Sequence, residues 1–162
     1  MRTSYAWAPR NQPAVAKEPF QRGKNITTIA TMTTSGMGEM LCFEGAADKH
    51  IMSQFIREVL APAHPQGGKI VLDNASIHNN NKFKNTAKRY GFQLQFLPAY
   101  SPDFSPIELT FSPIKHFLKK DQPTTIDEVA ASINKSSNRL TSETSRKMFS
   151  KCGYGNSFKL TA

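Results

Sequence analysis

The chain has 162 residues, 38% of them hydrophobic and 20% charged, which fits one globular domain with a modest core. Its 21 lysines and arginines outnumber 12 aspartates and glutamates, and the charge of +9 favours a polyanionic partner, although a solvated basic face would give the same count. The sequence has no apolar run long enough to span a bilayer and no apolar signal-peptide core. Cys42 and Cys152 have no CxxC spacing, which argues against a zinc site and a disulfide framework and indicates a reducing cytosol.

The first part of the chain predicts a loop-rich segment followed by a hairpin. Residues 1–24 are rich in proline, arginine, lysine and glutamine, which favours loop. The β-branched run over residues 25–33 and the apolar run over residues 39–45 predict two strands. The letters TSGMG between them are typical of a turn, so we expect the two strands to pair as a hairpin.

A helix and a strand–helix–strand unit follow. Apolar residues recur at helical spacing after Asp48, which predicts a helix capped by Asp48 and ended by Pro62. Residues 68–73 predict a buried strand, residues 79–90 a basic helix, and residues 92–97 another strand. This order predicts that the two strands are parallel and joined by a right-handed crossover.

Helices dominate the rest of the chain. One helix is expected to begin at Ser105 or Pro106 and to run toward Lys120, with a kink or a second start capped by Ser112 at Pro113.

Two shorter helices are predicted beyond it. The first covers residues 124–136, where Thr125 and Glu128 fit a capping box, and the second covers residues 142–151. The whole chain is therefore expected to be a single α/β domain over residues 1–162, with a loop-rich part (1–24), a core (25–121) and C-terminal helices (122–162).

Two carboxylates stand out against this framework. Asp73 ends an apolar strand, and Glu108 lies in the first turn of a later helix; residues 74–107, 34 positions, separate them. The strand over residues 92–97 returns the chain to the same edge of the sheet, where open α/β sheets build their sites. Converging carboxylates repel unless a cation lies between them, and Mg²⁺ suits that role because it prefers oxygen ligands.

Local structure offers a competing explanation for each residue. Ser105 and Glu108 also fit a capping box with proline at the first helical position, and this explanation is somewhat favoured on local grounds alone. Asp73 by itself fits a turn former more readily than a ligand. His78 lies in the same loop, where it would touch DNA or a nucleophile, or simply be an exposed histidine.

The amino-acid sequence around these carboxylates resembles that of a known family. "VLDNASIH" and "FLPAYSPDFSPIELTFSPIKHFLKK" are similar to the second and third acidic motifs of DDE transposases of the mariner/insertion-sequence-630 superfamily, and the 34-residue interval matches that branch. The resemblance covers nearly the whole chain, from "SYAWAPRNQPA" to "FSKCGY". Ser105 departs mildly from the asparagine usual in the family, and Phe111 is interpreted as core packing.

The resemblance implies an RNase H-like mixed sheet flanked by helices. It also implies metal-dependent DNA cleavage and strand transfer, with Asp73 and Glu108 as the second and third metal-binding carboxylates. Two Mg²⁺ ions, or Mn²⁺ in their place, would occupy the complete family site. The implied partners are transposon ends and target DNA, the complete protein would be a homo-oligomer with no membrane contact, and a prokaryotic insertion sequence would place it in the bacterial cytosol or nucleoid.

One departure from the family is serious. The first catalytic aspartate of the family lies on a first strand upstream of "YAWAPR", and the only aspartate before Asp73 is Asp48, at a helix start. We therefore expect an N-terminally truncated core that lacks the central first strand, has a split sheet and is inactive alone. It would be a fragment, or the downstream frame of a split gene whose upstream segment is a partner.

Two other functions are alternatives to a transposase core. One is a non-catalytic DNA-binding or interaction remnant, and the other is a different RNase H-like nuclease. For DNA contact, the candidate residues are Asn74 and His78 in the loop after the strand, Lys82, Lys84, Lys88 and Arg89 on one predicted helix, and Lys115, Lys119 and Lys120 on another. A solvated helix face explains each single lysine equally well.

Overall fold

The computed structural model describes residues 25–155, so the expected loop-rich segment over residues 1–24 lies outside the described residues. Its elements, in chain order, are β1 (Ile26–Thr33), β2 (Gly36–Glu44), α1 (Lys49–Phe55), the π-helical turn η1 (Ile56–Leu60), α2 (Ala61–Ala63), β3 (Gly68–Leu72), α3 (Asn81–Arg89), β4 (Phe92–Phe96), the 3-10 turn η2 (Pro102–Phe104), α4 (Pro106–Asp121), α5 (Ile126–Ser137) and α6 (Ser142–Lys151). This is the order of strands and helices that the sequence predicts. None of the helices in this part of the chain is long and apolar enough to cross a membrane.

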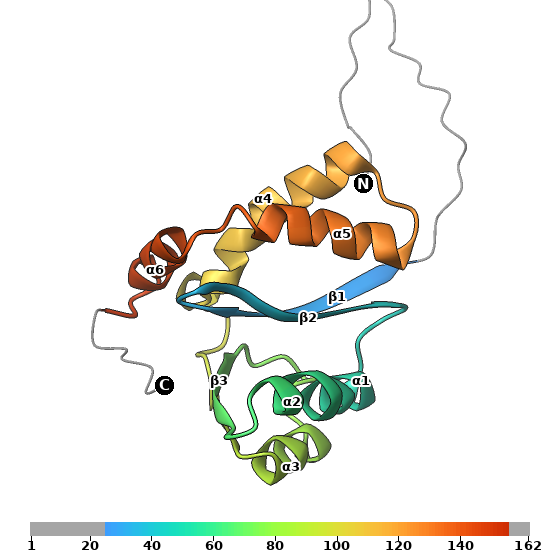
Figure 1. Cartoon of the computed structure of the whole chain (residues 1–162). Coiled ribbons are helices and arrows are strands. Elements are labelled where there is room, and N and C mark those ends of the chain that lie inside the picture. Colours follow the sequence, from blue (N-terminus) through green and yellow to red (C-terminus); the bar gives the residue numbers. More distant parts are fainter. Residues whose placement is uncertain (1–24, 156–162) are drawn as a thin grey trace, which may run out of the picture.

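The four described strands form two separate two-stranded sheets. β1 and β2 pair antiparallel as the predicted hairpin, and β3 and β4 pair parallel as the predicted strand–helix–strand unit. In Figure 1 the hairpin lies between α4 and α5 on one side and a lower lobe on the other, which we define as residues 49–96. The expected split of the sheet is therefore confirmed within the described residues.

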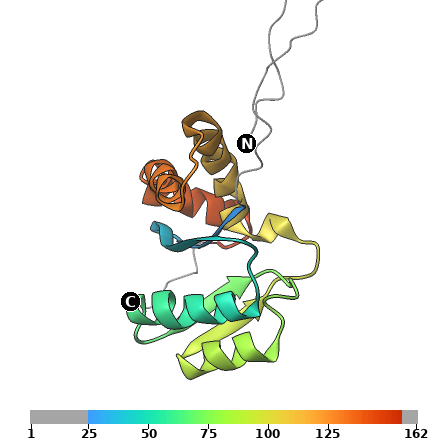
Figure 2. The same cartoon turned by 90° about the vertical axis from the view of Figure 1, so that its right-hand side faces the viewer.

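Each side of the hairpin packs on its own core. In the lower lobe, Phe55, Ile56 and Phe83 are no more than 3% exposed, and Ile29 and Leu41 of the hairpin pack against this cluster. On the opposite side, a second cluster contains Ile114 of α4 with Val129 and Ile133 of α5. The hairpin residues that pack against it are Ile26, Met37, Met40 and Cys42. A hairpin covered on both faces is typical of the interior of a layered α/β domain. Figure 2 shows the same layers from the side.

The two proline predictions have different outcomes. The helix that begins after Asp48 continues through the π-helical turn η1 and α2 and ends at Ala63, one residue after Pro62. Pro113 starts no second helix, because α4 continues through it from Pro106 to Asp121, and the kink expected as the alternative stays a prediction. The predicted N-cap at Asp48 and the capping box of Thr125 and Glu128 are both confirmed.

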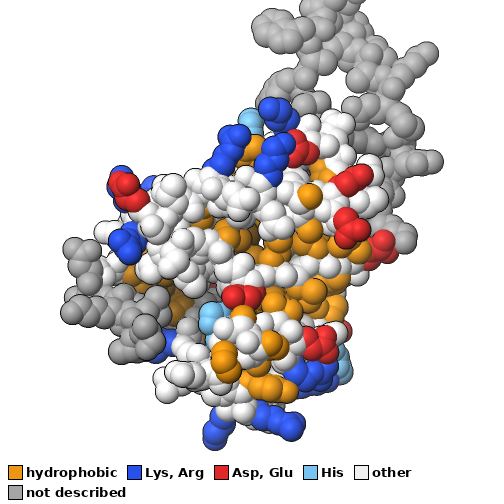
Figure 3. Space-filling view, in the orientation of Figure 1, with side chains coloured by type: hydrophobic (Ala, Val, Ile, Leu, Met, Phe, Trp, Pro, Cys, Tyr) orange, Lys and Arg blue, Asp and Glu red, His pale blue; other side chains and the backbone are white. Residues whose placement is uncertain are grey.

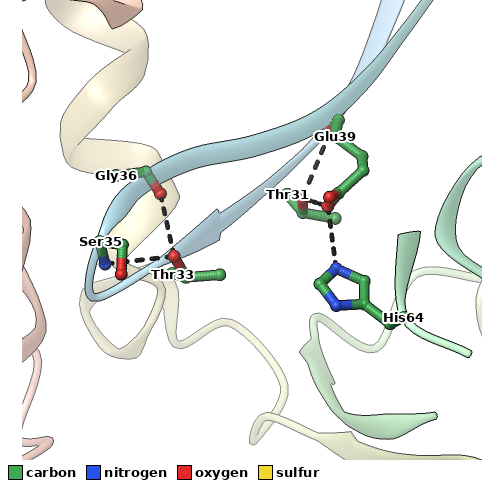
Figure 4. Close-up of polar contacts among 6 residues, drawn as sticks. All are labelled: Thr31, Thr33, Ser35, Gly36, Glu39 and His64. Carbon is green, nitrogen blue, oxygen red and sulfur yellow. Dashed lines mark hydrogen bonds and ion pairs between the residues drawn. The ribbon is translucent and has the colours of Figure 1, made fainter. Parts of the chain in front are cut away.

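A β-bulge in the hairpin aims one carboxylate at the lower lobe. Gly38 and Glu39 of β2 together oppose Thr31 of β1, and a Cβ on residue 38 would lie 2.5 Å from Thr31 Oγ1. The Glu39 carboxylate accepts a hydrogen bond from Thr31 Oγ1 at 3.1 Å and lies 3.2 Å from Nε2 of His64, the residue that follows α2 (Figure 4). This pair is a polar link between the hairpin sheet and the lower lobe.

The contact between Glu39 and His64 makes part of the free energy of unfolding depend on pH. Burial alone would raise the pKa of Glu39, but its own backbone N–H and the side chains of His64 and Thr31 outweigh that effect and leave the pKa below its ordinary value. The folded state therefore holds the charged carboxylate more tightly than the unfolded chain does. This contribution is present above the ordinary value of 4.5 and is lost as the pH falls through the lower folded value.

We expect Glu39→Gln to lower the free energy of unfolding by about 1 kcal/mol at pH 6 and by progressively less toward pH 3, because the wild-type carboxylate becomes protonated there. Urea unfolding across this pH range measures the difference. Glu143→Gln is the matched control, since the Glu143 side chain is 77% exposed beside Lys147 on α6. A Glu39→Gln effect that stays constant from pH 6 to pH 3 would contradict the prediction.

Candidate active site

Asp73 lies where the apolar strand β3 meets solvent. β3 ends at Leu72, β4 runs parallel beside it, and the N–H of Leu97 donates to the Leu72 carbonyl at 2.8 Å, so the two strands end at one edge. The side chain of Asp73 is 67% exposed there. Its position at the carboxyl edge of the parallel strands is the one predicted for a site in an α/β sheet.

Asp73 also shapes its own loop. Oδ1 of Asp73 accepts a hydrogen bond from the N–H of Ala75 at 3.1 Å. This is the contact expected if Asp73 acts as a turn former. The same oxygen lies 2.7 Å from Nδ1 of His78. Forming the turn occupies only Oδ1, so the turn and a ligand role are compatible in this geometry.

Glu108 lies on the helix that follows β4. The chain leaves the sheet edge through a loop and η2, and α4 then begins at Pro106 with Glu108 in its first turn. The expected capping box with Ser105 is absent, because the side chain of Ser105 makes no capping hydrogen bond. Glu128 of α5 does cap its helix, accepting backbone N–H groups of Thr124 and Thr125 at 2.7 and 3.2 Å.

The carboxylate of Glu108 is consequently uncommitted. Within residues 25–155 it makes no hydrogen bond or ion pair, and it lies at one end of an open groove along α4. The groove is lined by residues at helical spacing on one face: Glu108, Phe111, Ser112, Lys115, His116 and Lys119. Phe111 also packs against the core beneath α4, as predicted. Figure 3 shows basic side chains gathered at the top of the molecule, over the end of α4.

The basic residues of α3 differ in whether their side chains already contact other groups of the protein. Nζ of Lys82 lies 2.5 Å from Nδ1 of His50. Lys84 donates to Oδ1 of Asn79 at 2.6 Å, and its ammonium group lies 5.3 Å from the centre of the Phe96 ring. Lys84 thus helps to join α3 to β4, a structural role that helical spacing alone does not reveal.

The remaining basic candidates lie at a helix end. Lys88 and Arg89 are exposed in the last turn of α3, where cations also stabilise the C-terminal end of a helix. Asn74, the other loop candidate, accepts a hydrogen bond on Oδ1 from Asn79 Nδ2 at 3.1 Å.

Sequence reasoning missed one feature of the loop before α4. Tyr100 is fully exposed and has a left-handed backbone with φ of 56°, which is unfavourable for a residue with a bulky side chain. Phe104 is also 46% exposed. Exposed aromatic faces can stack on nucleic-acid bases. The sequence signal for this feature is the aromatic residue placed between Pro98 and Pro102.

The donor set limits which metal the site can hold. Asp73 and Glu108 would supply only carboxylate oxygens, which suit Mg²⁺ or Mn²⁺ completed by water and substrate oxygens. Within residues 25–155 no cluster of three or more histidine, cysteine, aspartate or glutamate side chains could enclose an ion. The present residues therefore fit an incomplete oxygen site.

Comparison with protein families identifies one match. The model of a family described as DDE superfamily endonuclease matches residues 1–130. A search of curated proteins found no relative that matches the chain.

Solved structures share the fold. The strand transfer complex of Mos1 and a paired-end complex of Mos1 transposase with the left transposon end each align with a TM-score of 0.73 and 18% identity, covering 93% of this chain and 47% of theirs. The catalytic domain of Mos1 transposase, solved with raltegravir and Mg, aligns with a TM-score of 0.61 and 15% identity, covering 78% of this chain and 71% of its own. The chain thus spans about half the length of the first two.

Proposed function

Because this chain belongs to the DDE superfamily endonuclease family, we propose that it forms the catalytic domain of a transposase, which cleaves DNA with divalent metal ions and joins the cut ends to a target. The observation that carries the proposal is the placement of Asp73 after β3 and Glu108 in the first turn of α4, with 34 residues (74–107) between them. Neither carboxylate is needed solely for local structure. Their exposure leaves both open to a metal and a phosphodiester.

In this proposal Asp73 and Glu108 are the ligands that hold Mg²⁺ or Mn²⁺ at the sheet edge. The bound ions would activate the attacking oxygen and stabilise the leaving oxygen of the phosphodiester. The contribution of the chain is to hold two carboxylates on a strand end and a helix start, which are rigid elements. The aromatic side chains of Tyr100 and Phe104 lie in the loop between them and offer faces for the unpaired bases of a cut strand.

The proposal requires a third carboxylate and a further strand. No aspartate precedes Asp48 in the sequence, and Asp48 is occupied as an N-cap by the N–H groups of His50 and Ile51, both at 2.8 Å. Each strand within residues 25–155 has one edge without a strand partner, and Figure 3 shows apolar side chains at the surface over the hairpin. A strand that ends in an aspartate, placed between β1 and β3, would join the sheets and complete the metal site.

The test is metal-dependent cleavage of DNA by two forms of the protein. One is residues 1–162, and the other is the same chain joined to the segment encoded immediately upstream of it. We expect the extended form to nick supercoiled plasmid in Mg²⁺ or Mn²⁺ and to lose this activity with EDTA. Its rate of nicking should be much higher than that of the shorter form. If no extended form cleaves DNA, the catalytic proposal is wrong, and the second candidate function, DNA binding without catalysis, takes its place.

The groove on α4 is proposed to follow the DNA backbone. Lys115 and Lys119 are exposed on the same face as Glu108, whereas Lys84 is engaged within the protein. We expect Lys115→Ala with Lys119→Ala to weaken binding to duplex DNA and to reduce the slope of log affinity against log salt by about 1 to 2, because each phosphate contact releases about 0.9 counterion. Fluorescence anisotropy over a range of salt concentrations measures both quantities.

The matched control for this double variant is Lys135→Ala with Lys147→Ala. It removes the same charge, but these lysines pair with Asp121 and Glu143 and lie outside the groove. Equal salt slopes for the two double variants would show that total charge, and not the α4 groove, governs the contact.

A further inference from the structure

The loop after β3 folds back on its first residue. The N–H groups of His78 and Asn79 both donate to the carbonyl of Ala75, at 2.9 and 3.0 Å. This turn returns His78 to Asp73, so that Nδ1 of the ring lies 2.7 Å from Oδ1 of the carboxylate. The contact is shorter than an ordinary N–H to O hydrogen bond and fits one that involves a charged carboxylate.

The ring of His78 packs against the core of the lower lobe. Its side chain is 18% exposed, and its centre lies 6.0 Å from the ring of Phe83, which is 2% exposed in the core of the lower lobe. Asn80 caps α3 through the N–H of Phe83 at 2.9 Å and donates to the carbonyl of Ile77 at 2.6 Å. The loop, the helix start and the core therefore fix the imidazole before any ligand arrives.

The two oxygens of Asp73 consequently differ. Oδ1 accepts the N–H of Ala75 and contacts Nδ1 of His78, whereas Oδ2 has no hydrogen-bond partner within residues 25–155. A carboxylate held at one oxygen cannot rotate freely, so its second oxygen points in a defined direction. Partners that orient a metal ligand in this way are commonly worth 10- to 100-fold in metal affinity.

We propose that His78 is a positioning residue that holds Asp73 by Oδ1 and so presents Oδ2 to the divalent ion. The proposal rests on the proposed function of Asp73 as a metal ligand. It also assigns the tautomer of the neutral ring: the proton is on Nδ1, which donates to the carboxylate, and Nε2 carries the lone pair.

The first measurement needs no metal. Long-range ¹H–¹⁵N correlation spectra of the full chain, recorded where the ring of His78 is neutral, should show the Nδ1–H tautomer. Asp73→Ala should shift the ring toward the Nε2–H tautomer, because the acceptor is lost. An Nε2–H tautomer in the wild-type chain, or no change in Asp73→Ala, would overturn the assigned contact.

The second measurement compares Mn²⁺ binding by paramagnetic broadening of the amide signals of residues 72–75. His78→Phe keeps an aromatic ring against Phe83 and removes the donor, so we expect its Mn²⁺ affinity to fall at least about tenfold. His78→Asn places an amide N–H near the position of Nδ1 and should restore affinity to within about threefold of wild type. Equal Mn²⁺ affinity in the wild type and His78→Phe, or equally weak binding by both variants, would overturn the proposal.

The two measurements separate the failure of this inference from failure of the proposed function. If the wild-type chain shows no Mn²⁺ broadening near Asp73 while the Nδ1–H tautomer is present, the contact is real but Asp73 binds no metal in this chain. That result overturns the positioning role together with the metal role. Circular dichroism of each variant verifies that the fold is retained.

Discussion

Asp73→Asn is expected to lower the rate of metal-dependent DNA cleavage by the extended chain at least about a thousandfold, because a neutral amide cannot hold a cation whose charge stabilisation is worth several kcal/mol. Asparagine has nearly the same shape as aspartate, and its Oδ1 can still accept the N–H of Ala75 and the contact from His78. The loss should therefore come from charge and not from unfolding. Single-turnover cleavage of a labelled duplex in Mg²⁺ measures the effect.

Asp127→Asn is the control for this substitution. Asp127 is exposed in the first turn of α5, outside the loop and helix that carry the proposed site, and the change in charge is the same. We expect its rate to stay within about threefold of wild type, since surface substitutions away from a site have small effects. Glu108→Gln should match Asp73→Asn. If Asp73→Asn keeps a tenth or more of the wild-type rate, Asp73 is not a metal ligand.

The second large effect is expected on stability. Gly67 precedes β3 with φ of 73°, and a Cβ there would lie 2.2 Å from the carbonyl oxygen of Gly91, the residue that precedes β4. The N–H of Gly68 donates to the same carbonyl at 3.3 Å, so this close approach aligns the starts of the two parallel strands. Gly67→Ala should cost about 3 kcal/mol or more, because a backbone clash is added to the strain of a left-handed conformation.

Gly45→Ala separates the clash from the strain. Gly45 has φ of 98°, but a Cβ there would meet no atom within 4 Å. We expect it to cost about 1 to 2 kcal/mol from backbone conformation alone. Urea unfolding of both variants gives the two free energies. Equal costs for Gly67→Ala and Gly45→Ala would contradict the role of the contact with Gly91.

The candidate site shows what can be predicted from local patterns. The apolar run before Asp73 predicts a strand, and the Ser-Pro-Ile-Glu sequence predicts a helix that begins at Ser105 or Pro106 with Glu108 in its first turn; the structure has both elements. The same text wrongly predicts a capping box there, since Ser105 makes no capping bond whereas Thr125 does in a similar pattern. Whether a carboxylate is used locally depends on side-chain geometry, which residue types do not determine.

The sequence by itself determined the chain order of the elements, the hairpin, the parallel pair and the positions of Asp73 and Glu108, because periodicity, caps and turn residues act over a few neighbours. Only the tertiary structure decided that each face of the hairpin packs on its own core, that Lys84 lies over Phe96, and that His78 contacts Asp73. These features depend on distances between groups that different elements bring together. Such distances follow from how the layers pack, and the local pattern around each residue does not contain them.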